Sequence, residues 1–194
     1  MMQALGFILD TIIGFFILVL LLRFSLQCAR ASFNNPLSQF CISFTNWLVR
    51  PLRRVIPGLF GLDLATLVAA LLVAWVLSLL SAWILQSTGF TLPLSVLLPF
   101  TLGLAVIKVM QVELYLLIGS AFVLCILSWT RAYHHPMAGL LNALVAPLLR
   151  PLQRVIPPVS GFDLSPLVLI LVLQVILYFA LPSLQQSLLR AVLL

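Results

Sequence analysis

Four long apolar stretches constrain what this chain can fold into. A helix needs about 20 residues to cross a hydrocarbon core of about 30 Å, and each stretch is near that length or longer. They cover roughly Leu5 to Leu26, Leu64 to Leu85, Leu104 to Trp129 and Leu164 to Leu181. The fourth is the shortest, and we expect it to stop at Pro182. The pattern predicts an all-α membrane protein with about four transmembrane helices.

The charge content excludes a water-soluble fold. Only 7% of the 194 residues are charged, whereas a soluble domain carries about 25%. The net charge is +6, and most basic residues are arginines beside the apolar stretches. In that position they favour anionic phospholipids as partners, not nucleic acid. Three dispersed cysteines suggest neither a disulfide framework nor a metal site, and we expect no cofactor.

One motif occurs twice, one hundred residues apart. R-P-L-R-R-V-I-P begins at Arg50 and R-P-L-Q-R-V-I-P begins at Arg150, and twelve of nineteen aligned positions are identical without a gap. Such self-similarity indicates a tandem duplication. We divide the chain into a first repeat at 1–90, a linker or re-entrant segment at 91–103, and a second repeat at 104–194. Two crossings in each copy return the chain to its starting side, so the repeats are expected to run parallel.

A stretch with helical periodicity precedes each motif. Asn35-Pro36 and His135-Pro136 predict two helix starts, with proline at the first helical position. The apolar face of the first helix has residues at helical spacing: Leu37, Phe40, Cys41, Phe44 and Leu48. Its other face is polar: Ser38, Gln39, Ser43 and Asn46. Such an amphipathic helix can lie in the headgroup layer, and Pro147 is expected to end or kink its counterpart early.

The motif itself predicts an elbow that returns the chain to the bilayer. Prolines break the helix and a glycine permits the turn: Pro51, Pro57 and Gly61 in the first copy, and Pro151, Pro157 and Gly161 in the second. Five arginines of the two motifs are candidate lipid- or partner-binding residues: Arg50, Arg53, Arg54, Arg150 and Arg154. Asp63 and Asp163 stand where a helix cap belongs. They are also candidates for pairing with Arg54 and Arg154, or for a gate.

The segment from Thr91 to Leu104 decides the topology. Pro93, Pro99 and Gly103 interrupt it, and together with the following span it is expected to be too long for one helix. It could cross the membrane, re-enter it or lie on it. The positive-inside tendency favours four crossings in a bacterial inner membrane, with both termini outside and both arginine-rich connections in the cytoplasm. Lys108 and Glu113 would then lie in an outer loop, and the alternative is that they form an intramembrane pair.

The doubled R-P-L-x-R-V-I-P motif, each copy followed by G-x-D-L, resembles the YggT family of bacterial membrane proteins. The resemblance covers nearly the whole chain. It implies a multi-pass inner-membrane protein and a link to osmotic-stress tolerance and potassium uptake, but it supplies no catalytic residues. The copies differ at one charged position, because Gln153 stands where the first copy has Arg53.

Two functions follow as hypotheses. The first is a non-enzymatic membrane protein that binds anionic phospholipids and other membrane proteins, or a second copy of itself, in envelope assembly or osmotic-stress tolerance. The alternative is a component of a small cation (potassium) channel or transporter at the seam between the repeats. The sequence contains no P-loop, H-E-x-x-H or G-x-S-x-G motif. We therefore expect no enzyme and identify no small-molecule substrate.

Overall fold

The computed structural model describes residues 2–31, 35–58, 62–86, 93–129, 136–156 and 163–193, which are helical almost throughout. The helices of the N-terminal half are α1 (Met2–Cys28), α2 (Pro36–Val55) and α3 (Leu64–Gln86). Those of the C-terminal half are α4 (Leu94–Trp129), α5 (Pro136–Val155), α6 (Ser165–Val175), the π-helical turn η1 (Ile176–Ala180) and α7 (Leu181–Leu193). Within these described ranges, four segments are long and apolar enough to cross a membrane. The prediction of an all-α membrane protein with about four spans is confirmed.

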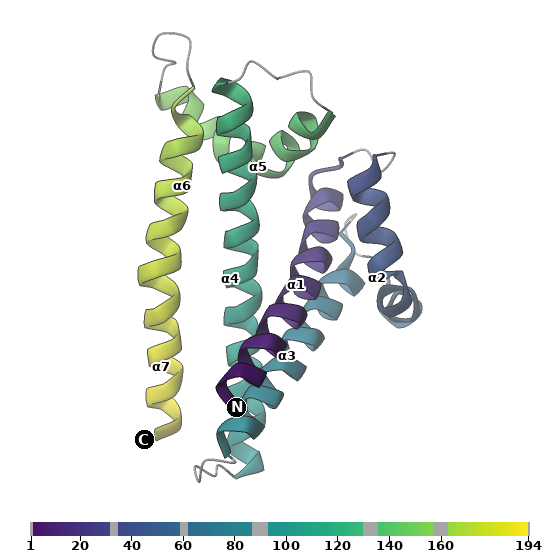
Figure 1. The fold of residues 1–194 in the computed structure, drawn as a ribbon, viewed down its shortest axis with the longest axis vertical. Helices are drawn as coiled ribbons and strands as arrows, with labels where there is room; N and C mark the ends of the chain where they lie inside the picture. Colours follow the sequence, from purple (N-terminus) through teal and green to yellow (C-terminus); the bar gives the residue numbers. More distant parts are fainter. Residues whose placement is uncertain are drawn as a thin grey trace.

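The duplication is visible in the helix boundaries. α2 and α5 are both 20 residues long, begin at Pro36 and Pro136, and end at Val55 and Val155. The two predicted helix starts are therefore confirmed. α5 and the first turns of α2 lie in the upper part of Figure 1, the last turns of α2 lie near its middle, and both termini lie in its lower half (Figure 1). The two arginine-bearing connections thus lie on the side of the bundle opposite the termini.

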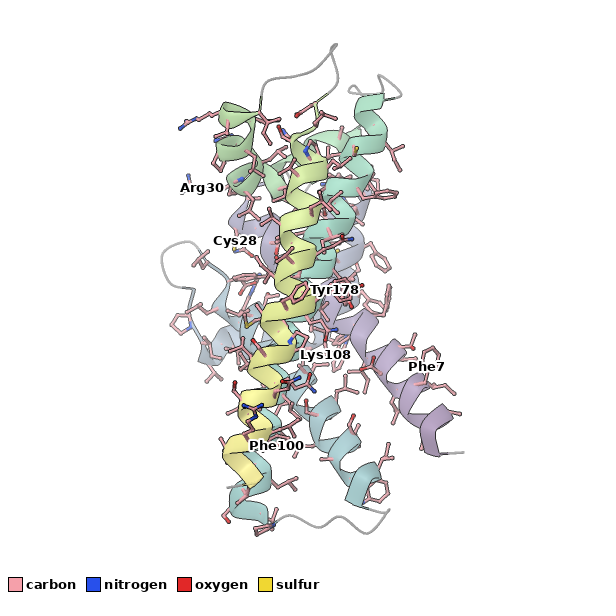
Figure 2. The ribbon with its side chains drawn as sticks, turned by 90° about the vertical axis from the view of Figure 1, so that its left-hand side faces the viewer. Phe7, Cys28, Arg30, Phe100, Lys108 and Tyr178 are labelled. Carbon is pink, nitrogen blue, oxygen red and sulfur yellow. The ribbon has the colours of Figure 1, made fainter. Side chains whose placement is uncertain are left out.

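Small residues allow the spans of the first repeat to pack closely. Four of the buried positions along α3 are alanines: Ala65, Ala69, Ala70 and Ala74. They pack with Ile17 and Leu20 of α1, and small side chains let membrane helices approach one another. Large apolar side chains point outward instead, as Phe7 of α1 does in Figure 2. This arrangement suits a helix bundle whose outer surface contacts lipid.

The two repeats meet where α5 packs on α1. Leu140, Leu141 and Leu144 of α5 form one buried cluster with Leu22 and Leu26 of α1. α4 joins the same seam, because it contacts both α1 and α5. The second repeat therefore packs against the first mainly through α4, which contacts α3 and α1, and in addition through α5.

The expected break before Leu104 is wrong. α4 is a single helix of 36 residues that begins at Leu94 and contains Pro99. Pro99 lies near the start of this helix, where the missing N–H removes only one hydrogen bond. Gly103 does not interrupt it either: a Cβ atom there would lie 2.8 Å from Cδ2 of Leu188, so the glycine permits close packing of α4 against α7. The division of the chain at 91–103 stays a prediction.

Pro182 does not end the fourth span. The helix continues through it, and α7 runs to Leu193. The preceding turn is π-helical, with the N–H of Leu181 donating to the carbonyl of Ile176. Widened turns of this kind accommodate local irregularities in a helix. The widened π-helical turn therefore allows the helix to continue through Pro182.

Prolines inside the amphipathic helices also fail to end them. Pro51 lies within α2, and Pro147 and Pro151 lie within α5. The predicted break at Pro51 is wrong, and Pro147, which was expected to end or kink its helix, does not end it. A proline removes one backbone hydrogen bond and can bend a helix without terminating it. In Figure 1 the last turns of α2 leave the direction of its first turns. α2 ends just before Pro57, where Ile56 adopts the extended conformation favoured by a residue that precedes proline.

Candidate functional site

The first elbow is closed by an ion pair between Arg53 and Asp63. Nε of Arg53 lies 3.3 Å and 3.2 Å from the two carboxylate oxygens of Asp63, and Nη2 donates to Oδ2 as well. The side chain of Asp63 is only 4% exposed, whereas that of Arg53 is 47% exposed. The expected partner of Asp63 was Arg54, so this expectation is wrong.

Asp63 also holds the start of α3. It directly precedes the helix, and the hydroxyl of Thr66 donates to its Oδ2. Burial alone would raise the pKa of this carboxyl, but the hydrogen bonds from Arg53 and Thr66, with the charge of Arg53, outweigh burial and hold the pKa below its ordinary value. Asp63 is therefore ionised at neutral pH and ties the end of α2 to the start of α3.

The second elbow repeats this geometry without the cation. Nε2 of Gln153 donates to Oδ2 of Asp163 at 2.8 Å, and the backbone N–H of Ser165 donates to Oδ1 at 2.9 Å. Burial would raise the pKa of Asp163, but these hydrogen bonds outweigh it and lower the pKa. The position between Leu and Arg in R-P-L-x-R thus contacts the aspartate in both copies. Gly61, Pro157 and Gly161 lie outside the described residues, as do His134 and His135.

A second polar contact of the first repeat joins α1 to α2. Nη1 of Arg23 in α1 donates to Oγ1 of Thr45 in α2 at 2.8 Å, and only 3% of Arg23 is exposed. One hundred residues later these positions are Val123 and Val145. The sequence analysis missed this contact, although an arginine inside an apolar span is by itself a signal of a buried partner.

The four other arginines of the two motifs are exposed. Arg50 and Arg54 lie in the last turns of α2, and Arg150 and Arg154 in those of α5. None of the four takes part in an ion pair within the described residues. α2 and α5 lie on the side of the bundle opposite the termini, so that side of the surface is basic, with two of these arginines at the end of each helix (Figure 1). We call these four residues the elbow arginines from here on.

α2 is amphipathic as expected, with Gln39, Ser43 and Asn46 exposed, but its buried face differs from the expected one. The buried strip is made of small residues, Ser38, Cys41, Thr45 and Val49. Ser38 was expected on the outer polar face, but it is fully buried, and its N–H donates to Oδ1 of the capping residue Asn35 at 2.9 Å. The large aromatic residues Phe40, Phe44 and Trp47 are exposed. Phe44 contacts Phe15 and Phe16 of α1, and Trp47 contacts Phe16. Such aromatic groups suit a membrane interface.

The loop placement of Lys108 and Glu113 is wrong, because both lie on α4 within a candidate span. Lys108 is near the middle of the bundle in Figure 2, well below Arg30. Its Nζ lies 2.6 Å from Oδ1 of Asp10 in α1. Charged residues inside spans pair in this way because hydrocarbon does not solvate them. This ion pair links α1 to α4.

Glu113 reaches α1 through a different partner. Oγ of Ser25 donates to its Oε1 at 2.7 Å. Its other oxygen, Oε2, is buried and has no hydrogen-bond partner in the described part of the chain. No group of three or more metal-ligating side chains occurs among the same described residues. Glu113 is thus a buried carboxylate at the seam, with one acceptor unused.

Comparisons with known proteins agree with the duplicated architecture. The family model described as CCB3/YggT matches residues 2–84 and 103–184. The chain is 37% identical over 180 residues to the "Uncharacterized protein YggT" of Escherichia coli K12, covering 90% of this chain and 88% of that protein. An uncharacterized protein of Pseudomonas aeruginosa is 38% identical over 173 residues, covering 88% and 84%. One of Vibrio alginolyticus is 35% identical over 173 residues, covering 89% and 91%. No solved structure matches the chain.

Proposed function

Because this chain belongs to the CCB3/YggT family and has four helices able to span a membrane, we propose that it works by association and not by catalysis. The elbow arginines bind anionic phospholipid headgroups on the cytoplasmic face of a bacterial inner membrane. The exposed aromatic strip of α2 meets another membrane protein or a second copy. Through these contacts the protein supports envelope assembly or osmotic-stress tolerance.

The observation that carries this proposal is the basic surface formed by the elbow arginines. All four are exposed, and no carboxylate in the described ranges pairs with them. Guanidinium groups bind phosphates through paired hydrogen bonds, and each basic residue near an anionic membrane contributes about 1 kcal/mol. Four such groups on the side of the bundle opposite the termini can select anionic lipids.

The test replaces the elbow arginines by glutamine and leaves Arg53 in place, because Arg53 closes the first elbow. Native mass spectrometry of the purified protein measures bound phosphatidylglycerol against phosphatidylcholine. We expect the wild type to retain phosphatidylglycerol preferentially and the fourfold variant to lose that preference. Arg190→Gln is the matched control, since Arg190 is an exposed basic residue on α7. An unchanged lipid ratio in the fourfold variant would refute the lipid-binding mechanism.

A cellular test addresses the finer role. Cells that lack the protein would be complemented with the wild type, the fourfold variant or Arg190→Gln, and their growth followed after an osmotic upshift. The proposal predicts recovery with the wild type and the control only. Recovery with the fourfold variant would separate osmotic tolerance from lipid binding.

Glu113 favours the alternative, a component of a small cation channel or transporter. Its buried Oε2 lacks a partner among the described residues, and a carboxylate inside a span is a candidate cation ligand. Potassium flux into sealed liposomes, compared between the wild type and Glu113→Gln, tests this function. Flux that falls with the variant would support conduction at the seam, and a wild type without flux would refute it for the single protein.

A further inference from the structure

A cavity lies beside the second elbow and is lined by Gln153, the residue that corresponds to Arg53 of the first elbow. Its volume is about 250 Å³. Its polar lining consists of Asn142, Gln153 and Asp163, and its apolar lining includes Leu124, Leu149 and Pro166. Leu124 is in α4 close to the end of the candidate span at Leu127. The cavity therefore lies at one end of the bundle, at the depth of the lipid headgroups.

The first repeat shows which chemistry belongs beside this aspartate. Asp63 receives a guanidinium from position 53, whereas position 153 is a glutamine, which is shorter and uncharged. Asp163 has no ion-pair partner in the described segments. The second repeat thus keeps the carboxylate, Asp163, but has no cationic side chain at the position of Arg53.

We propose that the cavity binds the primary ammonium group of a membrane phospholipid headgroup, in the place that the guanidinium of Arg53 takes in the first repeat. The lining offers three acceptors, namely the carboxylate of Asp163 and the amide oxygens of Gln153 and Asn142. A primary ammonium has three N–H donors, so the two sets match in number. A quaternary ammonium has no N–H donor and cannot make these bonds.

One further feature fits a zwitterionic aminophospholipid. Arg150 precedes Gln153 by three residues, which makes the two side chains neighbours on the surface of α5. Arg150 is exposed and can hold the phosphate of the same lipid.

This inference rests on the proposed association with headgroups but concerns the ammonium and not the net charge of the lipid. The test therefore compares two zwitterionic lipids with the same acyl chains, phosphatidylethanolamine and phosphatidylcholine. Native mass spectrometry of the full-length protein in neutral detergent gives the ratio of the two bound lipids. Since hydrogen bonds to a charged group are the strong ones, we expect about a tenfold preference for phosphatidylethanolamine.

Two variants locate the site. Gln153→Arg supplies the cation found in the first repeat, so it should fill the cavity, pair with Asp163 and bring the ratio to about one. Asp163→Asn removes the charge and should lower the preference as well. Gln39→Arg is the matched control: it adds the same charge on an exposed position of α2 and should keep the preference. An unchanged ratio in both Gln153→Arg and Asp163→Asn would overturn the proposal, as would equal binding by the wild type.

Free ethanolamine added to the same assay separates the two sources of a primary ammonium. If it fails to displace phosphatidylethanolamine at millimolar concentration, the site belongs to the lipid. Displacement would make a soluble amine the ligand and would overturn the lipid assignment. A preference for phosphatidylethanolamine that survives in the fourfold arginine variant, together with unchanged binding of phosphatidylglycerol, would refute the proposed function and leave this inference standing.

Discussion

At the residue scale, the side chain at position 53 or 153 decides how each elbow is held. Arg53 brings a positive charge and several N–H donors to Asp63, whereas Gln153 brings one hydrogen bond and no charge to Asp163. Both carboxylates accept charge-assisted hydrogen bonds, but only that of Asp63 is also paired with a cation. The two copies of one motif therefore form a strongly closed elbow and a weakly closed one.

We predict that Asp63→Asn destabilises the protein more than Asp163→Asn. The first change removes a buried charge that binds Arg53 and Thr66, and should cost about 1–2 kcal/mol after allowing for the partial exposure of Arg53. The second removes a charge held by Gln153 and a backbone N–H, and should cost about 0.5–1 kcal/mol. Unfolding by a denaturing detergent, followed by tryptophan fluorescence, measures both. Equal losses would contradict the difference between the elbows.

The lowered pKa of Asp63 predicts how stability depends on pH. A carboxyl group whose pKa is lower in the folded state contributes stability above its unfolded value, and loses it as the pH falls through the folded value. The ordinary value is 3.8, so this contribution is complete at neutral pH and disappears as the pH falls below about 4. Unfolding scans in an uncharged detergent, compared between the wild type and Asp63→Asn, should converge at low pH. A constant difference across that range would contradict the assignment.

Asp63 itself could be predicted from sequence, but its partner could not. An aspartate after a turn and before a span is typical of a helix cap, and the duplication singled it out. Arg53 and Arg54 are about 100° apart around a helix, so the choice between them depends on whether the helix continues past Pro51. We expected it to break there, and the continued helix directs Arg53 towards Asp63.

At the element scale, prolines and glycines were harder to interpret than hydrophobic runs. The length of an apolar run predicts a span because the hydrocarbon thickness is fixed. A proline removes one hydrogen bond, and neighbouring helices or a π-turn can compensate in ways that sequence does not reveal. Pro99, Pro147 and Pro182 all remain within helical segments. The spans could thus be predicted, but their ends could not.

Gly103 provides a test of this packing role. Gly103→Leu should push α7 away from α4 because Leu188 already lies against the glycine, and overpacking costs about 1–3 kcal/mol. Gly119→Leu is the matched control on the same helix, since nothing lies within 4 Å of a Cβ atom there. Detergent unfolding should show a loss for Gly103→Leu and little change for Gly119→Leu. Equal stability of the two variants would argue against close contact between α4 and α7.

At the scale of the whole molecule, the seam between the repeats carries Lys108, which the sequence analysis placed in a loop. Its partner Asp10 is 98 residues away, and no local pattern connects the two. Hydrocarbon makes an unpaired charge costly, so each of these residues requires a partner that only the three-dimensional arrangement supplies. The repeat predicted that two units would assemble, whereas the chemistry of their contact became visible only in the fold.

Parallel repeats make a prediction about sidedness. Single cysteines at positions 54 and 154, in a background in which Cys28, Cys41 and Cys125 are replaced by alanine, should react with an impermeant thiol reagent from the cytoplasm only. A cysteine at Leu94 should react from outside only, since α4 begins at the opposite end of the bundle from α2 and α5 (Figure 1).

Met110 serves as the internal control for this experiment. It lies within the α4 candidate span and is exposed on the outside of the bundle, so a cysteine there should face lipid and react from neither side. Labelling of positions 54 and 154 from opposite faces would place an odd number of crossings between the two elbows. The repeats would then be inverted, and the elbow arginines could not act on the same membrane surface.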